Sequence, residues 1–316
     1  MRLREIKRRT WIYALYKRIQ ESIYMKYPVE MTKRFYKKQM KKPLNLDNPR
    51  DLNEKIQWLK LFSDTSQWSL LADKYRVRDF IRERGLGHLL VELYGAWDTP
   101  DEIDFDTLPD KFVMKTNNGF NDSVIVRDKS KMNAAEVRGK MRASLNRHFG
   151  VSTLEPHYLR ISPKKIIAER LLEDNTVGAF SRSLIDYKLW CFNGEPFGFY
   201  VVYDRAIGTS YHVRDFYDLD WNHRTDWMTD KSPRHPIPKP KGIETMIEAG
   251  KILSKGFPEM RVDFYDIDGD IHLGELTMSA TSGCMSYFSP ELLLAMGEKC
   301  DISHVKRRQT DGVPAR

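Results

Sequence analysis

The chain has 316 residues, of which 41% are hydrophobic and 12% aromatic, so it can bury a large core and has the composition of a globular protein. Its formal net charge of +8 suits a nucleotide, an anionic sugar or an anionic membrane surface as a partner. The sequence has no zinc-ligand spacing and no RNA-binding aromatic motif, so we expect no nucleic acid partner.

The three cysteines, Cys191, Cys284 and Cys300, lie far apart in the sequence, which argues against a disulfide framework and against a zinc site. No apolar run approaches the roughly 20 residues that span a bilayer. The basic start of the chain has a short apolar part and no small-residue cleavage site, so we expect no signal peptide. These features together favour a cytoplasmic location.

Residues 1–70 are predicted to form an N-terminal helical segment. In its first part, apolar residues recur at helical spacing between basic ones, namely Ile12, Leu15, Tyr16, Ile19 and Ile23. Two interpretations remain open. The first helix either packs against the protein with a solvated basic face, or lies on the cytoplasmic face of the inner membrane as a peripheral contact.

Residues 71–165 are predicted to form an α+β subdomain around a polar loop. A strand at 111–115 leads into Thr116-Asn-Asn-Gly-Phe-Asn-Asp, and a second strand follows at 123–126. Such a loop can bind phosphates through the backbone N–H groups of Asn118 and Gly119, while Lys115 contacts the negative charge. The alternative is an ordinary hairpin with a surface lysine.

Residues 166–300 are predicted to form a second α+β subdomain, and 301–316 a flexible basic tail. Strands are expected at 165–172, which leaves Glu169 at an edge, at 186–196 and at 197–203, and helices at 243–255 and 290–296. The irregular segment 211–227 is rich in aromatic residues. It is either a surface on which a sugar stacks or a packed insertion.

Residues 261–279 predict a β-hairpin, because apolar and polar residues alternate on both sides of an Asp-Gly pair. A period of two places Arg261 and Asp263 on one face of the first strand, and Glu275 and Thr277 on one face of the second. Two acids on neighbouring strands can hold Mg²⁺, which takes a few carboxylates and leaves its other positions to water and phosphate oxygens. The alternative is a solvent-exposed hairpin with incidental acids.

The register of this hairpin decides whether Asp263 and Glu275 lie on the same face of the sheet. A plain two-residue turn at 268–269 pairs Asp263 with Gly274 and turns Glu275 to the opposite face. A three-residue loop or one bulge pairs Asp263 with Glu275 instead. We therefore predict that the two carboxylates share a face and that the turn carries one extra residue.

Taken in order, these motifs resemble the ATP-grasp superfamily, and more closely the TupA-like ATP-grasp family, over residues 35 to 300. The phrases that carry the resemblance are Leu52-Asn-Glu-Lys-Ile-Gln-Trp-Leu-Lys, Ala72-Asp-Lys-Tyr-Arg-Val-Arg, Lys115-Thr-Asn, Asp186-Tyr-Lys and Gly274-Glu-Leu-Thr. The resemblance implies an α+β fold in which two subdomains with antiparallel sheets enclose ATP behind an N-terminal helical unit. It also implies ATP and Mg²⁺ as cofactors.

The resemblance further implies how the first subdomain binds the nucleotide. Lys115, with Asn118 and Gly119 in the loop after it, would bind the phosphates, and Lys74 would be an additional phosphate contact. Glu169 would accept a hydrogen bond from the adenine amino group. The backbone from Arg170 to Leu172 would contact the edge of the adenine ring.

In the second subdomain, the resemblance implies that Asp263 and Glu275 hold Mg²⁺. Lys188 would approach the phosphates, and Arg261 would face the γ-phosphate, so these two side chains are the expected catalytic residues. Thr277 stands where most of the superfamily has an asparagine ligand, which leaves the number of Mg²⁺ ions open. Gly119 is the single glycine of a loop that usually has several.

The function that the resemblance implies is an ATP-dependent carboxylate–amine ligase that works through an acyl-phosphate. The family is associated with the synthesis of capsules and other cell-surface polysaccharides, so the expected substrate is a small molecule or a polysaccharide carrying a uronic acid, joined to an amino acid or amine. Two alternatives are a small-molecule kinase on the same fold and a glycosyltransferase that uses a nucleotide sugar. The latter would rely on the D-x-D pairs at 104–106, 218–220 and 266–268.

Overall fold

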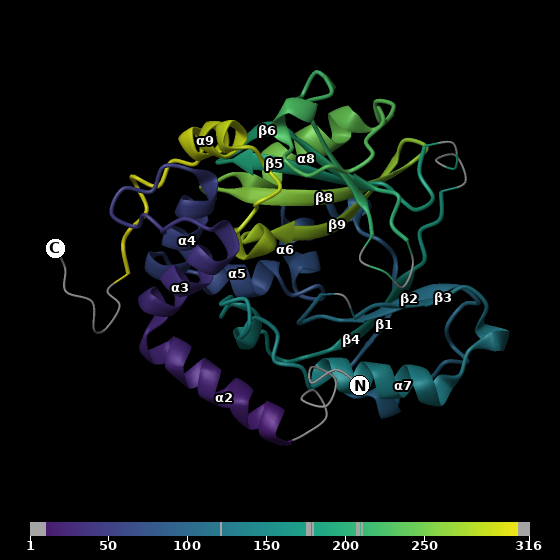
Figure 1. Ribbon diagram of the computed structural model, residues 1–316. Helices are drawn as coiled ribbons and strands as arrows, with labels where there is room; N and C mark the ends of the chain where they lie inside the picture. Colours follow the sequence, from purple (N-terminus) through teal and green to yellow (C-terminus); the bar gives the residue numbers. More distant parts are fainter. Residues whose placement is uncertain are drawn as a thin grey trace.

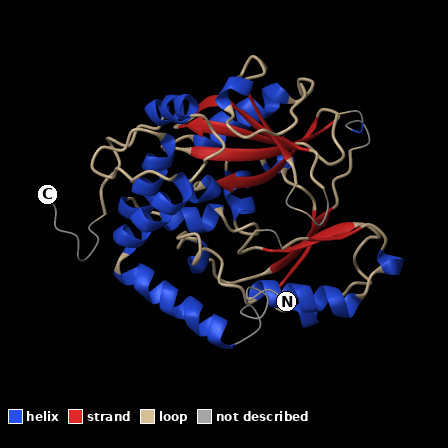
Figure 2. Cartoon of the chain, viewed as in Figure 1, coloured by secondary structure: helices blue, strands red, loops and turns tan. Residues whose placement is uncertain are grey.

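The computed structural model describes residues 11–120, 122–174, 178, 180–206, 209 and 211–308. Two antiparallel sheets lie one above the other, and a group of helices covers one end of both (Figure 1). Helices and strands are both abundant (Figure 2) and both sheets are antiparallel, so the predicted α+β class is confirmed.

The helices at that end come mainly from the N-terminal part of the chain. They are α2 (Trp11–Lys26), α3 (Pro28–Met40), α4 (Leu52–Phe62), α5 (Ser66–Leu71) and α6 (Val77–Glu83). Helix α4 begins with a capping box, in which Asp51 accepts from the backbone of Glu54 and the Glu54 carboxylate accepts from the backbone of Asp51. Its buried face packs against the C-terminal helix α9 (Pro290–Lys299), which ties the two ends of the chain together.

The smaller sheet is built from β1 (Leu93–Trp97), β2 (Phe112–Thr116), β3 (Val124–Val126) and β4 (Ile166–Arg170) in the order β1-β4-β2-β3. Helix α7 (Ala134–Leu145) covers its lower face in Figure 1 and buries Val137 and Met141 there. The central strand β4 is therefore buried, which explains its run of apolar residues. The strands expected at 111–115 and 123–126 are both present, as β2 and β3.

The larger sheet has the strand order β7-β6-β5-β8-β9. Its strands are β5 (Asp186–Phe192), β6 (Glu195–Tyr203), β7 (Val213–Tyr217), β8 (Met260–Ile267) and β9 (Asp270–Thr277). Helix α8 (Ile243–Ser254) covers one face, where a Cβ atom on Gly250 would lie only 2.6 Å from Leu189. Single-turn helices complete the fold: η1 (Gly87–Leu89), η2 (Pro100–Glu102), η3 (Lys129–Lys131), η4 (Tyr158–Arg160), η6 (Thr225–Trp227) and η7 (Ala280–Gly283).

The turn of the β8–β9 hairpin differs from our expectation. Ile267 pairs with Asp270, so the turn has only two residues, Asp268 and Gly269. Both have positive φ, 54° and 99°, as the favoured two-residue hairpin turns require. The prediction of an extra residue in the turn was wrong.

The extra residue is Gly274, further along the second strand. Phe264 pairs with Leu273, and the next pair is Asp263 with Glu275, so Gly274 forms a bulge between them. A Cβ atom on Gly274 would lie 3.2 Å from the ring of Tyr265, so this position favours glycine. The predicted pairing of Asp263 with Glu275 is therefore confirmed, and a bulge rather than a longer loop produces it.

Most aromatic rings of the segment 211–227 pack against other rings of the protein, so this segment is a packed insertion. Phe216 and Tyr217 lie on β7 and are buried, and Trp221 stacks on Tyr217 with ring centroids 4.4 Å apart. Trp227 stacks on Phe197. These rings fill the core of the larger sheet, and we do not retain the sugar-stacking interpretation for them.

The helical pattern in the first part of the chain forms two helices, α2 and α3, with Tyr27 between them. Residues 1–10 lie outside the described part of the chain. Among the described helices, none combines the length and apolar character needed to cross a bilayer.

Candidate active site

Lys115 lies near the end of β2, where its side chain forms an ion pair with Glu169 of β4. The distance from Lys115 Nζ to Glu169 Oε2 is 2.6 Å, and Arg78 of α6 approaches the other carboxylate oxygen at 3.3 Å. Arg78 also donates a 2.8 Å hydrogen bond to the carbonyl of Val91. Each oxygen of Glu169 thus has its own cation, and this carboxylate fixes Lys115 at the base of the loop.

Lys74 joins the helical unit to that loop. Its Nζ donates to the carbonyl oxygen of Gly119, and its backbone N–H donates to the carbonyl of Asn117 at 3.2 Å. Asn117 in turn donates to the buried carboxylate of Asp73 at 2.9 Å. A residue from the segment before α6 therefore sets the conformation of the loop between β2 and β3.

Position 119 requires glycine because there is no room for a side chain. A Cβ atom at this position would lie 2.1 Å from the ring of Phe149, which is buried beside the loop. The ring of Phe120 also lies beside Phe149, with centroids 5.4 Å apart. Packing against Phe149 thus explains this one glycine, and Asn118 beside it is buried.

Arg261, Asp263, Glu275 and Thr277 form one connected cluster on the larger sheet. Arg261 Nε donates to Asp263 Oδ1 at 2.6 Å, and its Nη2 donates to Asp263 Oδ2 at 2.8 Å. The same Nη2 lies 3.0 Å from both Glu275 Oε1 and Thr277 Oγ1. All four residues predicted to share a face do so.

Lys188 joins this cluster from the neighbouring strand β5, where it pairs with Asp263 and donates to Asp263 Oδ2. Asp186, two residues earlier on the same face, lies 3.5 Å from Lys188 Nζ and forms a second ion pair with Arg205 at 2.7 Å. The next residue, Leu189, is on the opposite face of the strand and lies beside Gly250 of α8. The cluster therefore lies on the face of the larger sheet that α8 leaves uncovered.

The carboxylate of Glu275 is where charges from both halves of the molecule meet. Desolvation would raise its pKa, but Arg261, Lys188 and Lys74 together lower that pKa to about 2. Lys74 belongs to the unit that carries the polar loop, whereas Lys188 and Arg261 belong to the larger sheet. Burial lowers the pKa of Lys74 itself, with Glu275 opposing that effect and Lys115 adding to it. An anionic ligand between the lysines would be stabilised by all of these cations.

The carboxylates of Asp263 and Glu275, with the Thr277 hydroxyl beside them, have the chemistry of a Mg²⁺ site. Among the described residues there is no group of three or more His, Cys, Asp and Glu side chains arranged for a metal ion. Two carboxylates suit Mg²⁺, which is held by one or two acids together with water and substrate phosphates. The donor set therefore fits this ion when a phosphate is present.

The end of β4 is where the adenine contacts were predicted. The backbone N–H of Arg170 donates to the carbonyl of Glu92 at 3.0 Å, and its guanidinium lies 2.8 Å from Nε2 of His272 on β9. Leu172 follows, half-buried, at the point where the chain leaves the smaller sheet. The adenine roles of Glu169, Arg170 and Leu172 remain predictions.

Three residues of the site were missed from the sequence. Arg78, which positions Glu169, lies in the quoted phrase Ala72–Arg78 and could have been found there. Arg205 follows a strand with no signal of its own. Tyr158 on η4 is the third: burial and then the carboxylates of Glu155 and Glu275 raise the pKa of its phenol.

The structure thus has two antiparallel sheets, with Lys115 on the smaller one and a cation-neutralised pair of acids on the larger one. The class of protein with this architecture is the ATP-grasp superfamily. The model of the TupA-like ATP-grasp family matches residues 54–300, and the chain belongs to that family. This match confirms the family predicted from the sequence and the predicted cofactors, ATP and Mg²⁺.

Among solved structures, the chain is similar to D-alanine–D-alanine ligase from Bacillus anthracis complexed with ATP, at 15% identity and a TM-score of 0.40. That match covers 69% of this chain and 58% of the ligase. The corresponding enzyme from Helicobacter pylori is 12% identical with a TM-score of 0.44, and covers 81% of this chain and 68% of its own. An L-amino acid ligase from Bacillus licheniformis is 12% identical with a TM-score of 0.40, over 70% of this chain and 43% of that one. No curated protein matches the chain.

Proposed function

We propose that the protein is an ATP-dependent ligase that joins a carboxylate to an amine. The observation that carries the proposal is the meeting of Lys74, Lys188 and Arg261 around Glu275, opposite Lys115 and the polar loop. Phosphoryl transfer depends on positioning and on charge neutralisation more than on a protein nucleophile, and this site supplies both.

In the first half of the reaction, an oxygen of the substrate carboxylate attacks the γ-phosphorus of ATP, forming an O–P bond while the bond to ADP breaks. Lys74 and Lys115 bind the phosphates, and Arg261 and Lys188 neutralise charge on the transferred group. Asp263 and Glu275, with Thr277 as a weaker donor, hold Mg²⁺, which supplies further charge neutralisation when bound. In the second half, an amine attacks the acyl carbon and phosphate leaves.

The glycosyltransferase alternative gains no support from the D-x-D pairs. In each of them the first aspartate uses its carboxylate to accept backbone N–H groups of its own turn. Asp104 accepts from Asp106 at 3.0 Å, Asp218 from Asp220 at 3.1 Å, and Asp266 from Gly269 at 2.5 Å. A small-molecule kinase needs only the first half of the reaction, so it is the second candidate.

The decisive experiment is to trap the intermediate. Purified protein is incubated with MgATP, a panel of uronic and amino acids, and hydroxylamine, and hydroxamate and ADP are measured together. A ligase gives hydroxamate in step with ADP, because hydroxylamine captures an acyl-phosphate. ADP release with a stable phosphorylated hydroxyl compound and no hydroxamate would identify a kinase. Protection from heating by a UDP-sugar but not by MgATP would instead favour the glycosyltransferase.

Replacing Lys115 by alanine is expected to weaken ATP binding by roughly 1.5–3 kcal/mol, because a desolvated charge-assisted contact is lost. Glu169 then keeps only Arg78 as a partner, so the melting temperature is a necessary parallel measurement. Calorimetry of the folded variant measures the affinity. The exposed Lys131, on η3, gives a matched control in Lys131→Ala. Equal ATP affinity in both variants would remove Lys115 from the site.

For the substrate we propose a carboxylate of a cell-surface polysaccharide, a uronic acid, joined to an amino acid or amine in the cytoplasm. The support is the family to which the chain belongs and the net charge of +8, which suits acidic sugars. Capsule synthesis is the setting that follows from this substrate.

We also propose that α2 contacts the inner face of the cell membrane. Its exposed apolar side chains Ile19, Ile23 and Met25 are 49%, 42% and 65% accessible, and Arg18 and Lys26 flank them. Flotation with vesicles of anionic phospholipid should recover the wild-type protein in the lipid fraction. An Ile19→Ser/Ile23→Ser variant should stay with the soluble fraction, and equal flotation of the two proteins would contradict the contact.

A further inference from the structure

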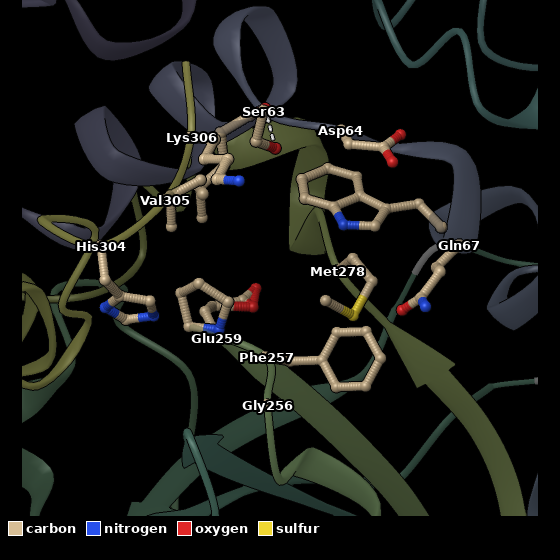
Figure 3. A pocket seen from close by; sticks show the side chains of 13 residues that line it. Ser63, Asp64, Gln67, Gly256, Phe257, Glu259, Met278, His304, Val305 and Lys306 are labelled. Carbon is tan, nitrogen blue, oxygen red and sulfur yellow. Dashed lines mark hydrogen bonds between the residues drawn. The ribbon is translucent and has the colours of Figure 1, made fainter. Parts of the chain in front are cut away.

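A cavity of about 240 Å³ lies at the end of the larger sheet (Figure 3). Its walls come from the helical unit, from the segments before β8 and after β9, and from residues 304–306 near the end of the chain. Trp68, Phe257 and Met278 make the walls largely apolar. Since a cavity of about 150 Å³ can hold benzene, this one can hold a small molecule with a branched or cyclic apolar group.

A carboxylate lines this cavity. Glu259 is 1% exposed, and neither of its oxygens accepts a hydrogen bond from any residue in the described part of the chain. Burying an acid without a partner is costly, and a ligand that donates hydrogen bonds or carries a positive charge would remove that cost. An ammonium group meets both conditions and would be a suitable partner for the Glu259 carboxylate.

The rim carries the opposite charge. Lys306 is exposed and lies across the cavity from Phe257 and Glu259 in Figure 3, with His304 beside it. The segment that bears both is held in place by a 2.6 Å hydrogen bond from the backbone N–H of Arg308 to the carbonyl of Phe62. An acid within, a cation at the rim and apolar walls between them match a zwitterion with an apolar side chain.

The position of Glu259 connects the cavity to the ligase site. Glu259 immediately precedes β8 and is two residues from Arg261, the spacing that places side chains on the same side of an extended chain. Successive side chains on one face are separated by about 7 Å, so a nitrogen between Glu259 and Arg261 can lie within about 3.5 Å of each. Trp68 of the cavity wall also contacts His157, the neighbour of Tyr158.

We propose that this cavity binds a small α-amino acid with an apolar side chain, its ammonium at Glu259 and its carboxylate at Lys306, as the amine partner of the ligation. The binding stands on the cavity alone, whereas the role as amine partner rests on the proposed function. In that role the ammonium gives one proton to the Glu259 carboxylate. The nitrogen lone pair forms the C–N bond to the acyl carbon, the C–O bond to phosphate breaks with its electrons on the phosphate, and the second proton leaves with that phosphate.

Proton linkage gives a signature of this contact. Burial raises the pKa of Glu259 well above its usual range, with Arg261 opposing that effect, so the free carboxyl holds its proton to higher pH than an exposed glutamate does. An ammonium binds the ionised form and releases that proton, so affinity rises with pH until the pKa of the free protein is passed. The other titratable groups around Glu259 are Arg261 on its own strand, Cys191 on β5, Cys300 after α9, Asp64 before α5, and His304 and Lys306 at the rim.

The test is calorimetry without nucleotide, using three probes of one shape: L-leucine, 3-methylbutylamine and 4-methylpentanoate. Wild type, Glu259→Gln and Lys306→Met are compared, with Glu298→Gln on the surface of α9 as the matched control. We expect Glu259→Gln to weaken leucine and the amine by about tenfold or more and to spare the acid. Lys306→Met should weaken leucine and the acid but spare the amine. Between pH 5.5 and 7.5, leucine should bind the wild type more tightly as pH rises, with proton release into the buffer.

Absence of leucine binding at millimolar concentration, or equal affinity in wild type and Glu259→Gln, would overturn the proposal. Since Glu259 has no partner to lose, its glutamine variant should melt at or above the wild-type temperature, which keeps the comparison sound. Leucine that binds through Glu259 but is never found in an amide product would overturn its role as amine partner. Hydroxamate formed by a protein that binds no leucine would leave the ligase proposal intact and remove only this one.

Discussion

Replacing Arg261 by methionine is expected to lower turnover by about 10²-fold or more, the scale of losing one donor that acts on the transition state. Methionine keeps most of the length and removes the charge. The guanidinium now contacts Asp263, Glu275 and Thr277 at once, so it lies where the transferred phosphoryl group is expected. Lys74 and Lys115 are also proposed to bind the phosphates of ATP, so ATP affinity should change far less than turnover.

The competing explanation is that Arg261 only neutralises the two acids. In that case Arg261→Met would change the melting temperature and the Mg²⁺ requirement while turnover at saturating Mg²⁺ stayed within a few-fold of wild type. Arg261→Lys is the informative companion, because it restores charge without the two-pronged contact to Asp263. Turnover is measured as ADP release in the presence of hydroxylamine.

Replacing Asp263 by asparagine is expected to abolish detectable ligation and to destabilise the fold. Asp263 is 3% exposed and is the common partner of Arg261 and Lys188, so the change leaves two buried cations facing a neutral amide. Removing one partner of a buried ion pair typically costs about 3–5 kcal/mol. The loss of a Mg²⁺ ligand adds to this, and ATP affinity should fall with Mg²⁺ present but change little in its absence.

Urea denaturation with and without Mg²⁺ separates the two effects of Asp263→Asn. Glu275→Gln is the matched comparison, because the side chain of Glu275 is 43% exposed and Lys188 donates its direct hydrogen bond to Asp263 instead. It should lose ligation with a much smaller loss of stability. Equal stability of the Asp263→Asn variant and the wild type would show that Asp263 does not hold the cations.

Much of the site could be predicted because strands have a period of two. That period alone placed Arg261 with Asp263 and Glu275 with Thr277, and the pairing across the hairpin followed once one extra residue was assumed. The position of that residue could not be predicted, since a bulge at Gly274 and a longer turn give the same facing acids. A side chain at position 274 would lie too close to the ring of Tyr265, and that proximity is invisible in the sequence.

Contacts between distant segments were the least predictable. Arg78 reaches Glu169 across 91 positions, and Lys74 reaches Gly119 across 45, because the helical unit folds against the smaller sheet. The strand at Val213–Tyr217 was missed since its aromatic residues lie in a segment of irregular composition. Glu259 gave no signal at all, because a buried acid without a partner can be recognised only when its surroundings are known.

Asp263 is paired with Arg261 and Lys188, so side chains of the protein itself neutralise the charge of this carboxylate. Many small metalloproteins fold only when the ion arrives, since their ligands repel one another without it. Here two internal cations offset that repulsion, so we expect the hairpin to keep its fold whether or not an ion is bound. Assembly of the site and its loading with Mg²⁺ would then be separate events.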